Sequence, residues 1–144
     1  MKYVGFLVSA FLSPSLASAD VRLHPCQVAA EVWASQEITA KYTNDMGPIE
    51  NLNAQGINIT IDQIRRSSDT AFCEQIVEAQ LHGFRIAAGR GNVEPLCELI
   101  FEVGRAGYMQ MFIDDGFHRE HAFHLSKFQT FLCMYEFPEK ATRL

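Results

Sequence analysis

The segment that decides the fold runs from Cys97 to Cys133 and reads CELIFEVGRAGYMQMFIDDGFHREHAFHLSKFQTFLC. Apolar residues recur at three- and four-residue steps on both sides of Asp114-Asp115-Gly116, which is the pattern of two amphipathic helices joined by a turn. Cys97 and Cys133 lie at equal sequence distances from Asp115. Two antiparallel helices would therefore bring the cysteines level with each other, where a disulfide would close the hairpin.

Both arms of the hairpin carry sequence signals for their ends. Asn92 is a suitable N-cap for the first arm, and Pro95 fits in the first turn because the N–H that proline lacks has no partner there. The apolar stripe then continues from Val93 to Met111. The second arm is expected to end before Pro138, because proline cannot continue a helix. We therefore predict one helix on each side of the turn.

The preceding part of the chain adds two more predicted helices. The first runs from about Pro25 to Tyr42, with a single large aromatic anchor at Trp33. The second is expected to open at a capping box, residues 60–63, and to continue through Ala79. A short alternation of isoleucines lies between them, but no second strand is visible to pair with it. The sequence therefore predicts an all-α fold, a small four-helix, disulfide-stapled bundle built on the C-terminal helical hairpin.

Residues 1–19 have the composition of a secretory signal peptide. One lysine precedes an apolar run from Tyr3 to Leu12, and Ala17-Ser18-Ala19 offers small residues for cleavage. The run is shorter than the ~20 apolar residues that span a bilayer, so no stable membrane insertion is expected after cleavage. The prediction is a periplasmic or secreted protein whose residues 20–144 form a single helical domain.

Four cysteines in an exported chain predict two disulfides, for which three pairings are possible. The spacing argument that pairs Cys97 with Cys133 also pairs Cys26 with Cys73, whose midpoint falls in a turn-rich stretch, and this is the preferred plan. The competing plan joins Cys26 to Cys133 and Cys73 to Cys97, which would tie the ends of the chain together. No two cysteines are close enough in sequence to form a CxxC metal-ligand pair.

The charge and the motifs narrow the function classes. The formal net charge is −5 at pH 7, which disfavours nucleic acid and anionic membranes as partners. No nucleophile motif, carboxylate pair or phosphate-binding loop stands out, and paired cysteines would leave no thiol as a nucleophile. We therefore predict a non-enzymatic binding protein that needs no cofactor.

The histidines offer the alternative function. His118, His121 and His124 are spaced by three residues, and neutral imidazole is a good ligand for copper or zinc. Steps of three drift around a helix, so two neighbouring histidines can share an ion more easily than all three. The competing interpretation places His121 or His124 at the edge of the core, with the others in solvent. The alternative function is thus a periplasmic copper- or zinc-binding protein.

The last third of the chain is rich in aromatic residues. Phe123 and Phe137 fall off the main apolar stripe of the second arm. They either pack against the first two helices, which is the simpler interpretation, or form an exposed patch that binds a protein partner. The partner interpretation is the functional hypothesis that follows from the sequence.

The order of several short features resembles a known family. These features are Phe72-Cys73, Gly83-Phe84, Cys97 at a helix start, and Phe131-Leu132-Cys133 followed by Phe137-Pro138. In this order the chain looks like periplasmic immunity proteins that neutralise the cell-wall-cutting toxins of type VI secretion. The resemblance implies a helical, disulfide-bonded inhibitor that plugs an amidase. The chain departs from that family in its glycine-rich segment after Cys73 and in lacking a proline closely after Cys97, so no functional residue is carried over.

Overall fold

The computed structural model describes residues 22–54, 59–89 and 91–144, and the predicted signal peptide lies outside them. The regular elements within these residues are all helical, which confirms the predicted all-α class. In chain order they are α2 (Pro25–Thr43), α3 (Gly47–Ala54), α4 (Ile61–Arg66), α5 (Thr70–Ala87), α6 (Glu94–Asp114), α7 (Arg119–Glu136) and the short 3-10 helix η1 (Ala141–Arg143). Across the described ranges, no helix is both long enough and apolar enough to cross a membrane.

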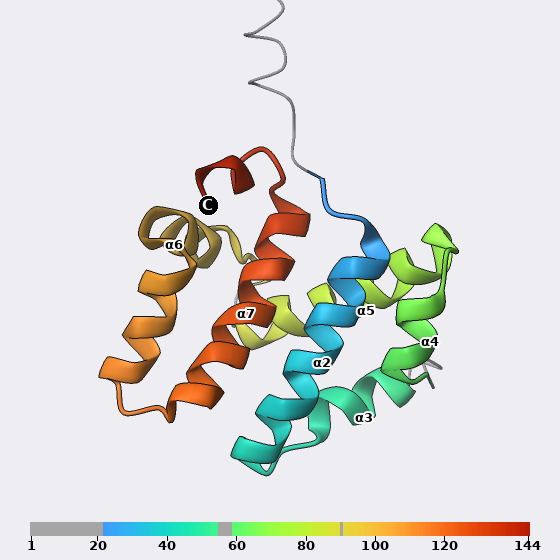
Figure 1. Ribbon diagram of the computed structural model, residues 1–144, viewed down its shortest axis with the longest axis horizontal. Helices are drawn as coiled ribbons and strands as arrows, with labels where there is room; N and C mark the ends of the chain where they lie inside the picture. The colour runs from blue at the N-terminus through green and yellow to red at the C-terminus, as the bar shows by residue number, and fades with distance from the viewer. Residues whose placement is uncertain (1–21, 55–58, 90) are drawn as a thin grey trace, which may run out of the picture.

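Among the four main helices, α2 and α6 pack against α7, and α5 packs mainly against α2. Figure 1 shows α7 between α6 and α2, with α5 crossing α2. α7 packs more extensively on α2 than on α6, its partner in the hairpin. The core lies where these helices meet, and its fully buried side chains include Val28, Val32, Leu81, Ile100 and Leu132. The predicted hairpin is therefore an integral part of one bundle, because α2 completes the burial of its second arm.

The two disulfides follow the preferred plan. Cys26 at the start of α2 is bonded to Cys73 on α5, with 4.9 Å between their Cα atoms. Cys97 on α6 is bonded to Cys133 on α7, with a Cα–Cα distance of 5.4 Å. The competing plan is therefore wrong, and no cysteine is left free. All four cysteines are buried, so the bonds are protected from solvent as well as closing two loops of the chain.

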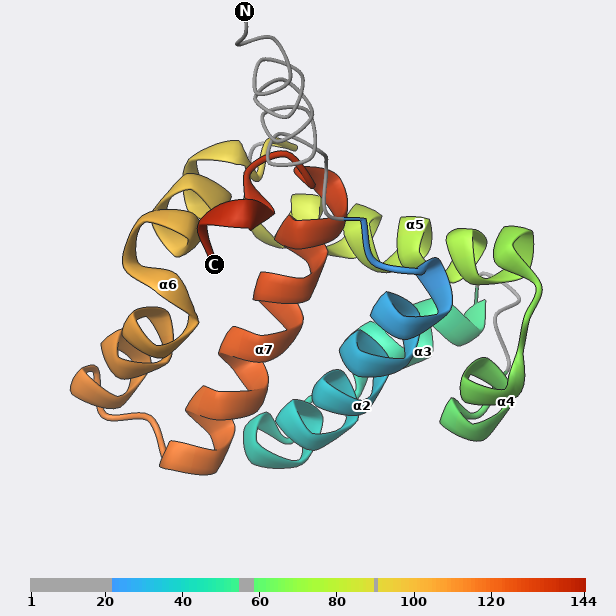
Figure 2. The ribbon, with the colours of Figure 1, turned by 45° about the horizontal axis from the view of Figure 1, so that its top comes forward.

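The first arm of the hairpin departs from the prediction at Gly104. This residue has φ 78° and ψ 168° inside α6, a conformation that is essentially confined to glycine. α6 is therefore two helical pieces, residues 94–103 and 105–114, and Figure 2 shows them running in different directions. The apolar spacing continues across the break, which is why the sequence pattern predicted a helix without interruption. The second piece carries the chain to the turn before α7.

The second predicted helix is also two helices. The capping box of Thr60 and Gln63 forms, but it opens only the short α4. Asp69 then caps α5, since its carboxylate accepts hydrogen bonds from the backbone N–H groups of Ala71 and Phe72. An aspartate that satisfies the free N–H groups of a helix start stabilises a new helix at that point. Ser67 supports the break, because its hydroxyl accepts a hydrogen bond from the Asp69 N–H.

Candidate functional site

Exposed apolar side chains gather where α2 and α6 end and α7 begins. Figures 1 and 2 both show these three helix ends together at one end of the bundle. The large side chains there have between 36% and 47% of their surface exposed, and they are Tyr42, Met46, Met111, Phe117 and Phe123. Tyr42, Phe117, His118, His121 and Phe123 are called the aromatic end below.

Local backbone signals bring these residues together. α2 stops just after Tyr42 because Asn44 adopts the left-handed conformation, with φ 55°. The chain turns at Gly116, with φ 97°, and the predicted Asp-Asp-Gly turn is therefore confirmed. His118 is the N-cap of α7, and its Nδ1 accepts a hydrogen bond from the Glu120 N–H at 3.2 Å. The cap fixes the direction in which α7 leaves the turn.

Ring contacts connect the aromatic end across helices. The Tyr42 ring stacks on His118 and on His121, with centroid distances of 5.3 and 5.2 Å. His121 also contacts Phe117 at 5.2 Å, and Phe117 contacts Phe112 edge-on at 5.1 Å. Aromatic rings at these separations attract one another beyond the effect of burial alone. The result is one continuous group of rings on α2, α6 and α7 that runs from Tyr42 through the two histidines and Phe117 to Phe112. Phe123 stands beside this group, and its ring contacts His124.

Charged groups on α7 anchor this surface to α2. The Tyr42 hydroxyl donates a 2.7 Å hydrogen bond to the Glu120 carboxylate, and this bond raises the pKa of Tyr42. Further along α7, Lys127 Nζ lies 2.7 Å from the Glu31 carboxylate of α2. These contacts add directional links to the apolar packing between the two helices. They hold the tyrosine ring in a defined orientation over the start of α7.

Burial favours the neutral form of the two inner histidines. It lowers the pKa of His121, and the neighbouring His118 lowers that pKa further. It also lowers the pKa of His124, with a smaller contribution from Lys127 in the same direction and an opposing one from Glu120. His121 Nε2 and His124 Nδ1 are buried without a hydrogen-bond partner. A neutral imidazole is the form that such an environment favours.

The three histidines predicted as metal ligands lie in the first turns of α7. Within the described residues, no group of three or more His, Cys, Asp and Glu side chains is placed to hold a metal ion. His118 caps its helix, the Tyr42 ring stacks against both His118 and His121, and His124 meets Phe123 edge-on at 5.0 Å. The structure therefore gives these histidines structural roles, and copper or zinc binding stays a prediction.

The two phenylalanines predicted to bind a partner lie at opposite ends of α7. Phe123 is 43% exposed, and Lys127 Nζ lies 5.6 Å from the centre of its ring. Phe137 is the C-cap of α7 and packs against the core, with Lys140 Nζ 5.0 Å from its ring centre. Only Phe123 thus belongs to the aromatic end.

The sequence interpretation missed Tyr42, whose position just before the helix stop at Asn44 was the available signal.

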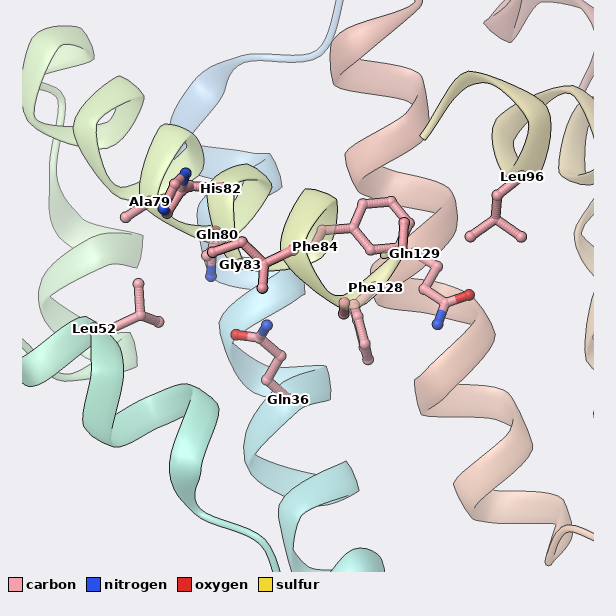
Figure 3. Close-up of a pocket in the computed structure, with 13 residues that line it drawn as sticks. Gln36, Leu52, Ala79, Gln80, His82, Gly83, Phe84, Leu96, Phe128 and Gln129 are labelled. Carbon is pink, nitrogen blue, oxygen red and sulfur yellow. The ribbon is translucent and has the colours of Figure 1, made fainter. Parts of the chain in front are cut away.

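A cavity of about 520 Å³ lies on another face, between α2, α3, α5 and the α6–α7 pair (Figure 3). Its wall is mainly apolar, with Phe84 of α5 and Phe128 of α7 as its aromatic side chains. Three glutamines also line it, Gln36, Gln80 and Gln129. Sequence reasoning did not predict this cavity. The available signal was Gln80, a polar residue within the buried stripe of α5.

No protein-family model, curated protein or solved structure matches this chain.

Proposed function

We propose that the protein is an exported, non-enzymatic binding protein that engages a protein partner through the aromatic end. The observation that carries the proposal is the group of contacting rings formed by Tyr42, Phe117 and the two neighbouring histidines, together with the exposed Phe123 in the first turns of α7. Tyrosine and other large aromatic side chains contribute most to the affinity of protein interfaces, particularly when rigid elements present them. Phe117 and Phe123 are exposed enough to enter a partner's apolar pocket.

The disulfides support the exported part of the proposal. Bonds such as Cys26–Cys73 and Cys97–Cys133 persist in oxidising compartments and are rare in the cytosol. The periplasm or the extracellular medium is therefore the proposed location. The bonds also make the scaffold stiff before it binds, which lowers the entropy cost of association.

The charge of the chain favours a partner with a basic surface. The net charge is −5. Glu120 contacts the Tyr42 hydroxyl, and Asp114 and Asp115 end α6 just before Phe117 in the chain. Opposite charges around an apolar contact accelerate association and select among partners. An enzyme whose active-site mouth is basic would suit this arrangement. Together with the residue order shared with immunity proteins, it makes an inhibitor-like role our specific form of the proposal.

Crosslinking at defined positions tests the proposal. A photoreactive phenylalanine replaces Phe123 in one variant and Leu144 in a control variant. Leu144 is similarly exposed, but it lies at the C-terminus, at the other end of the bundle (Figure 1). We expect illumination in the native compartment to give one discrete protein adduct from position 123 and none from position 144. Equal adducts from both positions, or no adduct from position 123, would overturn the proposal.

Measuring the affinity between the purified protein and the partner identified by crosslinking sharpens the same test. We expect Phe123→Ser to weaken the complex by roughly thirtyfold, the effect of losing one interface anchor, while Leu144→Ser leaves it unchanged. Circular dichroism of both variants shows that the fold is retained. Equal affinities of the two variants would place the interface elsewhere.

A further inference from the structure

The cavity between α2, α3 and α5 has the dimensions of a ligand site. Its volume of about 520 Å³ falls within the ~300–1,000 Å³ of small-molecule pockets. Leu52, Phe84 and Phe128 supply apolar wall from three different helices. Figure 3 shows these side chains around the space between α3, α5 and α7. Such a space accommodates a molecule with a substantial apolar body.

Two glutamine amides give the wall its specific chemistry. Gln80 is 2% exposed, and both its Oε1 and its Nε2 lack a hydrogen-bond partner. Gln36, which faces the same cavity from α2, has a buried Oε1 that is also unpartnered. Buried amide groups are nearly always hydrogen-bonded in folded proteins, because leaving them unpaired is costly. Two such groups beside one cavity indicate a missing partner there.

The third glutamine of the wall provides a contrast. Gln129 Oε1 accepts a hydrogen bond from the Tyr108 hydroxyl, so its acceptor is already used within the protein. Gln36 and Gln80 have no such tie. The last torsion of a glutamine side chain is soft, so either amide can turn toward a guest without movement of its helix. The unpaired groups are an amide N–H and amide oxygens, which together match a group that both donates and accepts.

The absence of charge limits the guest further. Among the lining residues that the structure describes, none is an aspartate, glutamate, lysine or arginine. An ammonium group would therefore lose its hydration at this wall without meeting a carboxylate, and a carboxylate would meet no lysine or arginine there, only the exposed imidazole of His82. A carboxamide would keep its hydrogen bonds by exchanging water for the glutamines. We therefore infer that this cavity binds a neutral amphipathic small molecule that presents a carboxamide to Gln80 and Gln36 and an apolar body to Phe84 and Phe128.

A displacement assay with matched head groups tests the assignment. N-phenyl-1-naphthylamine, a neutral dye that fluoresces in apolar sites, reports occupancy of the cavity. Octanamide, octanoate and octylammonium then compete for it with the same apolar chain. We expect octanamide to displace the dye at a concentration at least tenfold lower than either charged compound. Failure of the wild-type protein to bind the dye, or equal displacement by the three compounds, would overturn the assignment.

Substitution of Gln80 tests the polar contact. Gln80→Met preserves the volume of the side chain but removes its hydrogen-bonding groups. We expect this variant to bind the dye as the wild type does and to lose the preference for octanamide. Gln75→Met, at an exposed glutamine of the same helix, is the matched control and should keep the preference. A preference that survives in Gln80→Met would contradict the proposed contact.

A cavity-filling variant separates binding from folding. Gly83 lines the cavity, and a Cβ at this position would meet no atom within 4 Å. Gly83→Leu should therefore enter the cavity and abolish dye binding while the melting temperature stays the same or rises, since glycine is a poor helix former. Ala71→Leu, at an exposed position of the same helix, should leave dye binding intact. Unchanged dye binding by Gly83→Leu would place the dye outside this cavity.

Discussion

The two ends of the bundle are held by different means. At one end, Cys26–Cys73 joins the starts of α2 and α5, and Cys97–Cys133 joins the start of α6 to the last turns of α7. Pro25, Thr70 and Met134 line a second cavity at that end. At the aromatic end, ring stacking and the Tyr42–Glu120 hydrogen bond join α2 to α7 without a covalent link. We therefore expect the disulfide end to contribute more of the stability, while the aromatic end is the surface that we propose for binding.

The largest expected effect breaks the disulfide end. Replacing Cys97 and Cys133 together with alanine should lower the free energy of unfolding by about 2–5 kcal/mol, because the unfolded chain regains the entropy of an open loop. Replacing Cys26 and Cys73 should cost a similar amount, since the two bonds span comparable sequence separations of 36 and 47 residues. Urea unfolding of both double variants measures the difference. Loss of either bond at no cost would contradict the assignment of that stability to the disulfide end.

The break in α6 lies on the path between the two ends. Gly104→Ala should destabilise the protein by about 1–3 kcal/mol, because alanine cannot adopt the backbone conformation observed there without strain. Gly83→Ala is the matched control, since Gly83 lies in regular α5 with open space at its Cβ, and it should stabilise the protein by up to ~1 kcal/mol. Thermal unfolding of the two variants checks the opposite signs. Stabilisation by Gly104→Ala would mean that α6 prefers to be continuous.

A change of pH should act mainly on the aromatic end. The pKa of His121 and that of His124 are lowered by burial in the folded protein, whereas the unfolded chain titrates near the ordinary value of 6.5. The unfolded state therefore binds protons more readily, so the stability that the neutral imidazoles provide is complete above about pH 6.5 and is lost as the pH falls below it. Urea unfolding at pH 7.5 and pH 5.5 measures the loss.

Two variants test whether that pH dependence of stability comes from His121 and His124. His121→Phe combined with His124→Leu should flatten it, because neither replacement can be protonated. His82→Gln, at an exposed histidine of α5, should leave it unchanged. An equal flattening by both variants would move the origin of the effect away from the aromatic end.

The smallest expected effect concerns metal. Since Tyr42 stacks against His118 and His121, and no set of three ligands is assembled within the described residues, we expect zinc to be lost on dialysis. Native mass spectrometry after addition and removal of zinc tests this. One retained ion that disappears in His121→Ala would restore the metal-binding alternative and change the interpretation of this end.

The sequence predicted those features of the fold that depend on spacing. Equal distances from Asp115 identified the Cys97–Cys133 pair on the premise of two straight antiparallel helices, and the pair forms although α6 is broken at Gly104. The break at Gly104 was not predictable in the same way, since Gly107 lies in the same pattern and stays helical. Which of two glycines bends a helix depends on the packing of the whole bundle. Asp69, in contrast, was a recognisable N-cap that the pattern of apolar residues obscured.

The candidate sites depended on contacts between distant parts of the chain. The exposed position of Phe123 was consistent with its place off the main stripe, whereas Phe137 lies off the same stripe and packs against the core. The chain after Pro138 turns back, and Lys140 covers that ring and pairs with Glu94 and Glu98 of α6. The stacking of Tyr42 on the histidines and the cavity beside Gln80 likewise join helices that the sequence pattern treats separately.

The order of the disulfides determines how the chain would respond to a protease. The bonds close two consecutive loops, residues 26–73 and 97–133, that neither overlap nor enclose one another. A single cut inside either loop therefore leaves one covalently connected molecule, which would gain only the mass of a water molecule. A cut between residues 74 and 96 would instead give two separable fragments. The segment between the two loops, which includes the part of α5 that lines the cavity, is thus where one nick would divide the domain into two halves that each keep one disulfide.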